Sequence, residues 1–167
     1  MTLRQIGDNE YVEEYGGDYE DFEPGMTIRH WPGRTITETD NTWLTLLFMN
    51  QHPLHFDKHY AADAEYGRVL VNSQVTFGIV GGMTVNTLSA RAVANLGWDR
   101  VRMAEPVYVG DTLYATTEIL AKRRSNSRPN QGIVTVETTG TKSTGETVIV
   151  YERSFLVRCR ESPPPAA

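Results

Sequence analysis

The spacing of apolar residues changes along the chain and divides it into two parts. Beyond residue 100, apolar and polar side chains alternate with a period of two in the ranges 111–123, 132–142 and 146–160. The polar stretches "RSNSRPNQG" and "KSTGE", which contain glycine or proline, separate these ranges. Alternation bounded by such turns predicts three long antiparallel strands.

Before residue 100 the spacing is helical in two places. In the first, Leu44, Leu47 and Phe48 fall on one helical face. Thr37 is placed to cap this helix ahead of an acidic first turn, which the helix dipole favours. Pro53 disfavours helical geometry in the residue before it, so the helix is expected to end ahead of Pro53.

A second, longer helix is predicted from Asn72 to Leu96, with Asn72 or Ser73 as its cap. It is apolar over much of its surface, and its interior glycines each cost about 1 kcal/mol relative to alanine. A chain that keeps such glycines is expected to need close backbone packing, as in a buried helix wrapped by a sheet. Helices followed by a run of strands indicate an α+β domain.

Length and composition predict one globular domain. The chain has 167 residues, of which 40% are hydrophobic and 22% are charged, as in folded soluble proteins. We predict an acidic N-terminal arm over 1–18, one domain over 19–160 and a Pro-rich tail over 161–167. Aromatic residues within the acidic stretch could hold it against the domain or against another subunit.

Charge and cysteine content narrow the function and the location. The net charge of −5 argues against a nucleic-acid-binding protein, because such proteins present basic surfaces. No segment is apolar enough to resemble a signal peptide or to span a bilayer. The single cysteine, Cys159, fits a reducing compartment. We therefore expect a cytoplasmic protein without a membrane partner.

The stretch between the two predicted helices carries the candidate chemistry. "FMNQHPLHFDKHYA", residues 48–61, contains His52, His55 and His59 around a proline. No metal site is expected, because His52 and His55 lie in irregular chain without the helical i, i+4 spacing that places ligands on one face. Asp57 is expected to cap a backbone donor.

The stretches "FMNQHPLHFD", "YGRVLVNS" and "PVYVGDTL" occur in an order that resembles the MaoC-like dehydratase, or (R)-specific enoyl-CoA hydratase, family of the hot-dog fold. This resemblance implies a long central helix wrapped by an antiparallel sheet, pairing into at least a homodimer, and no dissociable cofactor. It also implies an enzyme that adds water reversibly across the C2=C3 bond of an acyl-CoA. The similarity is strongest to members acting on branched, carboxylated acyl-CoAs of the mesaconyl or itaconyl type.

The family's motif Gly-Asp-x-Asn-Pro-Leu-His falls on "NQHPLH", which places its aspartate on Asn50, its asparagine on His52 and its histidine on His55. In the family, the aspartate and the histidine hold one water between them. An amide cannot act as a base, so we expect His55 to transfer the proton and Asn50 to orient the water. His52 either shares the proton transfer or contacts a carboxylate of the acyl group.

Binding of the thioester oxygen and of the CoA phosphates requires further hydrogen-bond donors and positive charges. The family holds the thioester oxygen with a backbone amide at the start of the central helix, which here corresponds to Asn72 and Ser73. Lys122, Arg123 and Arg124, at a predicted strand end, are candidates for the CoA phosphates. Three arginines remain open for an acyl carboxylate: Arg29, Arg34 and Arg68.

Two alternative functions remain open beside the hydratase. A hot-dog thioesterase would bind the same substrates but attack the thioester carbonyl, commonly with a carboxylate on the central helix. Residues 72–96 contain neither Asp nor Glu, which favours the hydratase. A non-catalytic acyl-CoA binding protein is the other alternative, because the motif's aspartate is replaced.

Overall fold

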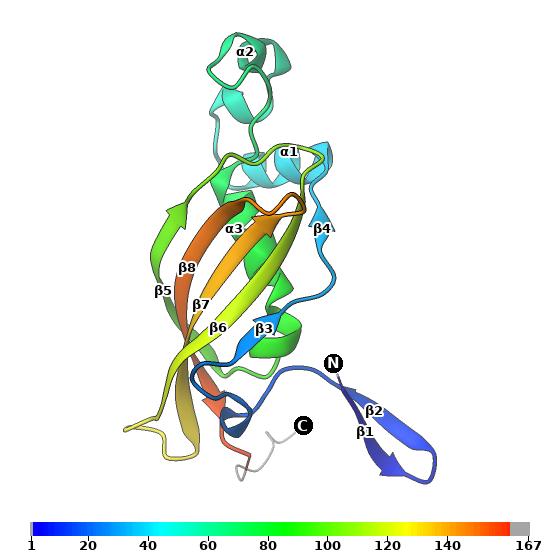
Figure 1. The fold of residues 1–167 in the computed structure, drawn as a ribbon, viewed down its shortest axis with the longest axis vertical. Helices are drawn as coiled ribbons and strands as arrows, with labels where there is room; N and C mark the ends of the chain where they lie inside the picture. Colours follow the sequence, from blue (N-terminus) through cyan, green and yellow to red (C-terminus); the bar gives the residue numbers. More distant parts are fainter. Residues whose placement is uncertain (1, 161–167) are drawn as a thin grey trace.

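An antiparallel sheet with one helix across its inner face forms the body of the protein (Figure 1). The computed structural model describes residues 2–160. The strands follow the order β3-β6-β7-β8-β5, and β4 also pairs with β6. They are β3 (Thr27–Arg29), β4 (Arg34–Thr35), β5 (Ala94–Met103), β6 (Thr112–Arg124), β7 (Gln131–Lys142) and β8 (Thr147–Arg158). The α-helices are α1 (Glu38–Leu47), α2 (Lys58–Asp63) and α3 (Ser73–Met83). None of the described helices is long and apolar enough to cross a membrane.

The three predicted strands are confirmed as β6, β7 and β8. Along β6, Leu113 and Ala115 are buried while Tyr114 between them is exposed, as a period of two requires. The buried side chains pack against Val75 and Val80 of α3. This contact between sheet and helix is the main core, and it confirms the predicted α+β class.

The first helix is also confirmed. Thr37 is the N-cap of α1: its hydroxyl accepts from the Asp40 amide, and the Asp40 carboxylate accepts from the Thr37 amide. The helix ends at Leu47, ahead of Pro53. Asp57 caps α2 by accepting from two amides of its first turn, as predicted.

The second helix is shorter than predicted, and the prediction of a helix over 72–96 is wrong in its last part. α3 is followed by one π-helical turn (Val85–Ser89), and β5 takes up the chain from Ala94. β5 pairs with β8 at the edge of the sheet, and this pairing satisfies the backbone hydrogen-bonding groups on the side of β5 that faces β8. Apolar spacing within 72–96 does not report that pairing, because β8 lies far along the chain.

The predicted reason for the glycines of α3 is wrong as well. A Cβ at Gly78 or Gly82 would meet no atom within 4 Å, and one at Gly81 would meet only the Tyr151 hydroxyl oxygen, at an ordinary contact distance of 3.6 Å. Gly78 and Gly82 line a groove of about 640 Å³ along the helix. The close approach is made by Gly140 of β7 instead. A Cβ there would lie 2.8 Å from the side chains of Ile149 and Val80. The sheet, rather than the helix, supplies the small residue at this contact.

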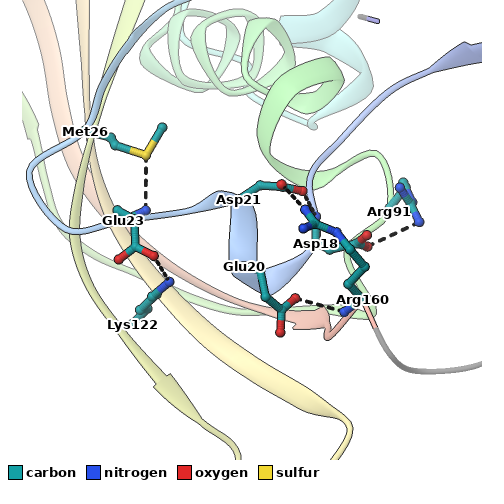
Figure 2. Close-up of polar contacts among 8 residues, drawn as sticks. All are labelled: Asp18, Glu20, Asp21, Glu23, Met26, Arg91, Lys122 and Arg160. Carbon is teal, nitrogen blue, oxygen red and sulfur yellow. Dashed lines mark hydrogen bonds and ion pairs between the residues drawn. The ribbon is translucent and has the colours of Figure 1, made fainter. Parts of the chain in front are cut away.

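The acidic N-terminal segment forms a hairpin followed by a turn that is tied to the body. The hairpin strands β1 (Thr2–Gly7) and β2 (Glu10–Glu14) project away from the main sheet (Figure 1). Acidic side chains in and beside the following turn, η1 (Tyr19–Asp21), form ion pairs with basic side chains of the body (Figure 2). The division at residue 18 stays a prediction, and the predicted tail over 161–167 lies outside the described residues.

A buried histidine joins the sheet to the helical layer. His30 is 5% exposed, and its two ring nitrogens lie 2.8 Å from the hydroxyls of Thr117 on β6 and Thr87 in the π-helical turn. Burial lowers the pKa of His30 from 6.5 to about 4. The fold therefore holds this ring in its neutral form near pH 7.

Acid is expected to destabilise the fold through His30. Between pH 6.5 and about 4 the unfolded chain binds a proton on His30 and the folded chain does not. The free energy of unfolding therefore falls as the pH is lowered through this range. The loss across this window is roughly 3 kcal/mol. Urea unfolding should show a shallower pH slope for His30→Gln than for wild type, whereas His59→Gln, on the exposed surface of α2, should keep the wild-type slope. Equal slopes in all three proteins would contradict this role.

Candidate active site

A cavity of about 270 Å³ lies where α3 begins. Its wall combines the turn before α2, the first turns of α3 and the chain that follows β5. The wall residues with polar side chains are His55, Tyr66, Ser73, Thr76 and Glu105. His55 is thus the residue of the histidine motif that lines the cavity.

The backbone fixes the position of His55. Pro53 opens a short 3-10 turn (Pro53–His55), whose first position suits the fixed φ of proline. The His55 ring donates from Nδ1 to the carbonyl oxygen of Leu70 at 2.9 Å. Because a carbonyl only accepts, Nδ1 carries the hydrogen, and Nε2 of the neutral ring is an acceptor. His55 can therefore take up a proton at Nε2.

Asn41 of α1 joins two of the segments that form the cavity, the turn of His55 and the start of α3. It is 1% exposed, and its Nδ2 donates to the carbonyl oxygens of His55, at 2.8 Å, and Leu70, at 3.3 Å. Its Oδ1 accepts from the Asn72 amide at 3.0 Å. Sequence reasoning missed Asn41, although it lies on the same helical face as Leu44, where an amide among apolar residues is a signal for a buried hydrogen-bonded group.

The other two motif residues are engaged in a local turn. Asn50 Oδ1 accepts from the His52 amide at 3.0 Å, and His52 Nδ1 accepts from the Leu54 amide at 3.2 Å. The rings of His52 and His55 lie near each other, with centroids 5.8 Å apart. Neither Asn50 nor His52 lines the cavity that contains His55. The roles predicted for these two residues stay predictions.

The start of α3 is the second polar part of the cavity. Asn72 caps the helix by accepting from the Gln74 amide at 2.9 Å, as predicted. Ser73 lines the cavity, and as the first residue of the helix its N–H has no intrahelical acceptor. The Thr76 hydroxyl, one turn further, is buried without a hydrogen-bond partner among residues 2–160. The positive end of the helix dipole favours a negatively charged oxygen here.

Glu105 places a carboxylate in the cavity wall. It lies two residues after the end of β5 and directly before the "PVYVGDTL" stretch, and it is one of the residues that line the cavity of His55 and Ser73. Sequence reasoning missed Glu105, because the motif directs attention to a carboxylate within residues 50–55 alone. Local spacing could not have found it, because β5 has to pair with β8 before this residue reaches the cavity.

The predicted CoA-binding cations lie at the other end of the sheet. These residues end strand β6, and this end of β6 is far from α2 (Figure 1). Lys122 pairs with Glu23 at 2.6 Å, as Figure 2 shows, and Arg124 pairs with Glu20 at 3.1 Å. Arg123 is exposed. Within one chain these residues are not brought to His55, and their role in CoA binding stays a prediction. No cluster of His, Cys, Asp and Glu suited to a metal ion occurs in the described part of the chain.

The sheet wrapped on α3, with a histidine and a helix N-terminus in one cavity, defines a hot-dog domain of the MaoC-like type. The family model described as mesaconyl-CoA hydratase matches residues 1–165. The chain therefore belongs to the mesaconyl-CoA hydratase family. The hot-dog fold and the MaoC-like resemblance predicted from the sequence are both confirmed.

Relatives and solved structures agree with this assignment. A β-methylmalyl-CoA dehydratase of Chloroflexus aurantiacus is 36% identical over 151 residues, which cover 90% of this chain and 43% of the relative. A solved putative MaoC-domain dehydratase from the same species superposes with a TM-score of 0.82 at 35% identity, covering 91% of this chain and 44% of that one. A Mycobacterium tuberculosis protein described as a double hot-dog fold shares the fold, with a TM-score of 0.80, 23% identity and coverage of 91% and 47%. The chain thus spans less than half the length of these proteins.

Proposed function

We propose that this protein is an enoyl-CoA hydratase that adds water reversibly across the C2=C3 bond of an acyl-CoA. The observation that carries this proposal is that His55 and the first turn of α3 line the same cavity. The hydrogen bond from Nδ1 of the His55 ring to Leu70 leaves Nε2 as the acceptor of that ring. The family and the names of the relatives favour a short branched or carboxylated acyl group of the mesaconyl type. We further propose that the enzyme needs no dissociable cofactor and that it acts in the cytoplasm.

The proposed reaction uses three groups of the cavity. His55 Nε2 takes a proton from water while the water oxygen bonds to C3. The electron pair of the C2=C3 bond moves toward the thioester, whose oxygen accepts a hydrogen bond from the Ser73 amide. The imidazolium then returns the proton to C2, which completes the addition of one water. The Glu105 carboxylate accepts a hydrogen bond from the second O–H of the water, whose hydrogen stays on the oxygen as the product hydroxyl, and it stabilises the imidazolium charge.

Replacing Glu105 tests which residue orients the water. We expect Glu105→Gln to lower kcat by roughly tenfold to a hundredfold, the effect of losing a hydrogen bond to a charged group. Asn50→Ala should stay within a few fold of wild type, since Asn50 does not line the cavity. Glu118→Gln, on the exposed face of β6, is the matched control and should be unchanged. A large loss of kcat in Asn50→Ala, with no loss in Glu105→Gln, would show that Asn50 and not Glu105 orients the water.

Three assays on the same esters separate the candidate functions. With crotonyl-, mesaconyl- and itaconyl-CoA, a hydratase removes the enoyl absorbance without releasing a free thiol. Release of free CoA, measured by thiol titration, would instead show a thioesterase. Binding of the esters with neither change would show a non-catalytic binding protein. Of these outcomes, only the first supports the proposal.

We also propose that two copies pair along β5. This strand lies at the edge of the sheet, and its exposed side chains include Leu96, Trp98, Val101 and Met103. An unpaired apolar edge favours strand pairing, and a second copy would continue the sheet. The chain that follows β5 forms part of the His55 cavity, so the partner would lie beside that cavity. Light scattering at micromolar concentration should give at least a dimer, and a monomer would contradict the pairing.

A further inference from the structure

A second cavity, of about 380 Å³, adjoins the site of His55. Its wall includes Phe56, the residue after His55, together with Arg68 and Tyr108. Tyr108 forms a β-bridge with Leu70, whose carbonyl holds the His55 ring. The two cavities are therefore lined by neighbouring residues of the same segments.

An aromatic contact also joins the two cavities. Tyr66, which lines the cavity of His55, packs edge-on against Tyr108 with ring centroids 6.5 Å apart. Tyr108 in turn lines the second cavity. A ligand that passes from one cavity to the other would run along these two rings.

Arg68 gives the second cavity an unneutralised positive charge. Its guanidinium carbon lies 3.5 Å from the centre of the Tyr108 ring, and no carboxylate among residues 2–160 pairs with it. Two nearby lysines are neutralised, by the pairs Lys58–Glu38 at 2.7 Å and Lys142–Asp111 at 3.0 Å. Stacking on an aromatic ring fixes the plane of a guanidinium and leaves its N–H edge available to a ligand.

The other two candidate arginines for an anionic group are placed less well. Arg34 forms an ion pair with Asp40 and lines the separate groove along α3. Arg29 lies on β3 and lines neither cavity. Of the three, Arg68 alone combines a side chain stacked on an aromatic ring, no carboxylate partner among residues 2–160 and a place in the cavity next to that of His55.

We propose that Arg68 binds an anionic group, a phosphate or a carboxylate, of the CoA thioester whose acyl end lies at His55. This inference rests on the proposed hydratase function, because it takes the ligand to be the substrate of that site. The planar fork of N–H donors on an arginine matches either oxyanion with two hydrogen bonds. The phosphates belong to the CoA part and the carboxylate to the acyl part, so the two sources can be separated by experiment.

Arg68→Gln is the test, with Arg29→Gln as the matched control on β3. Loss of the charge-assisted hydrogen bonds should raise KM by roughly tenfold or more. A rise for both crotonyl-CoA and mesaconyl-CoA, but not for crotonyl N-acetylcysteamine thioester, which lacks the phosphates, would identify a phosphate. A rise for mesaconyl-CoA alone would identify the acyl carboxylate. Unchanged KM values for all esters, or an equal rise in Arg29→Gln, would overturn the proposal.

Calorimetric binding separates this inference from the proposed function. If wild type hydrates none of the esters, the hydratase proposal fails, but the Kd values of crotonyl-CoA and mesaconyl-CoA can still be compared between wild type and Arg68→Gln. A Kd raised roughly tenfold in the variant would support an anion site at Arg68 without catalysis. An unchanged Kd, or no binding to wild type, would overturn it.

Discussion

Replacing His55 with alanine is expected to lower kcat by a factor of roughly 10² to 10⁴, the usual contribution of a positioned acid–base group. The ring donates from Nδ1 to Leu70 and presents Nε2 as the acceptor, so its removal takes away the group proposed to carry the proton. The fold should remain, because His55 is only partly buried and its backbone contacts survive the substitution. Steady-state hydration of mesaconyl-CoA measures the loss.

His59→Ala is the control for this variant. His59 is exposed on α2, its backbone amide donates to Asp57, and it lines neither of the two cavities near the motif. Its kcat should therefore match that of wild type. If His55→Ala also kept its rate within a few fold while thermal unfolding showed it folded, His55 could not be the proton carrier.

Asn41→Asp is expected to destabilise the fold more than any other single substitution at the site. The carboxylate has the shape of the amide but no N–H groups, so the carbonyl oxygen of His55 loses its donor, that of Leu70 keeps only the His55 ring, and both face a buried negative charge. Leaving a buried group unpaired costs about 1–3 kcal/mol and burying an uncompensated charge costs more, so we expect the free energy of unfolding to fall by about 3 kcal/mol or more. Urea unfolding measures this loss directly.

The same substitution should also slow the reaction. The Asn41 side chain positions the turn of His55 and the start of α3, so its loss should lower kcat under conditions where the protein is still folded. Asn126→Asp, in the exposed turn after β6, makes the same chemical change and should affect neither stability nor rate. If Asn41→Asp were as stable as Asn126→Asp, the hydrogen bonds of Asn41 to His55, Leu70 and Asn72 could not be what holds the site together.

Local patterns in the sequence predicted much of the fold. The period of two over 111–123 corresponds to β6, Thr37 caps the helix that was predicted after it, and Asp57 caps backbone donors as predicted, although the helix α2 that it starts was not predicted. These features depend on neighbours within a few residues, which the sequence shows directly. The end of α3 could not be predicted in this way, because the chain from Ala94 onward is decided by pairing with β8. Contacts between distant segments override local spacing.

The candidate site likewise contains residues that the sequence pointed to and residues that only the fold brings together. The motif with its resemblance pointed to His55, and the cap of α3 pointed to Asn72 and Ser73; the cavity contains His55 and Ser73. Glu105 and Asn41 could not be found from the motif, because each reaches the site only after β5 or α1 has packed against the rest of the fold.

The sequence by itself determined β6, β7 and β8 and the starts of α1 and α3, because each depends on residues close together in the chain, and its resemblance to a known family pointed to the histidine of the site. Only the tertiary structure decided which charges are free. Lys122 and Arg124 looked available in the sequence but are neutralised by Glu23 and Glu20, whereas Arg68 lies over Tyr108 without a carboxylate partner in the described chain. Whether a charge can bind a ligand depends on what the fold places beside it, and this information lies in contacts between distant residues.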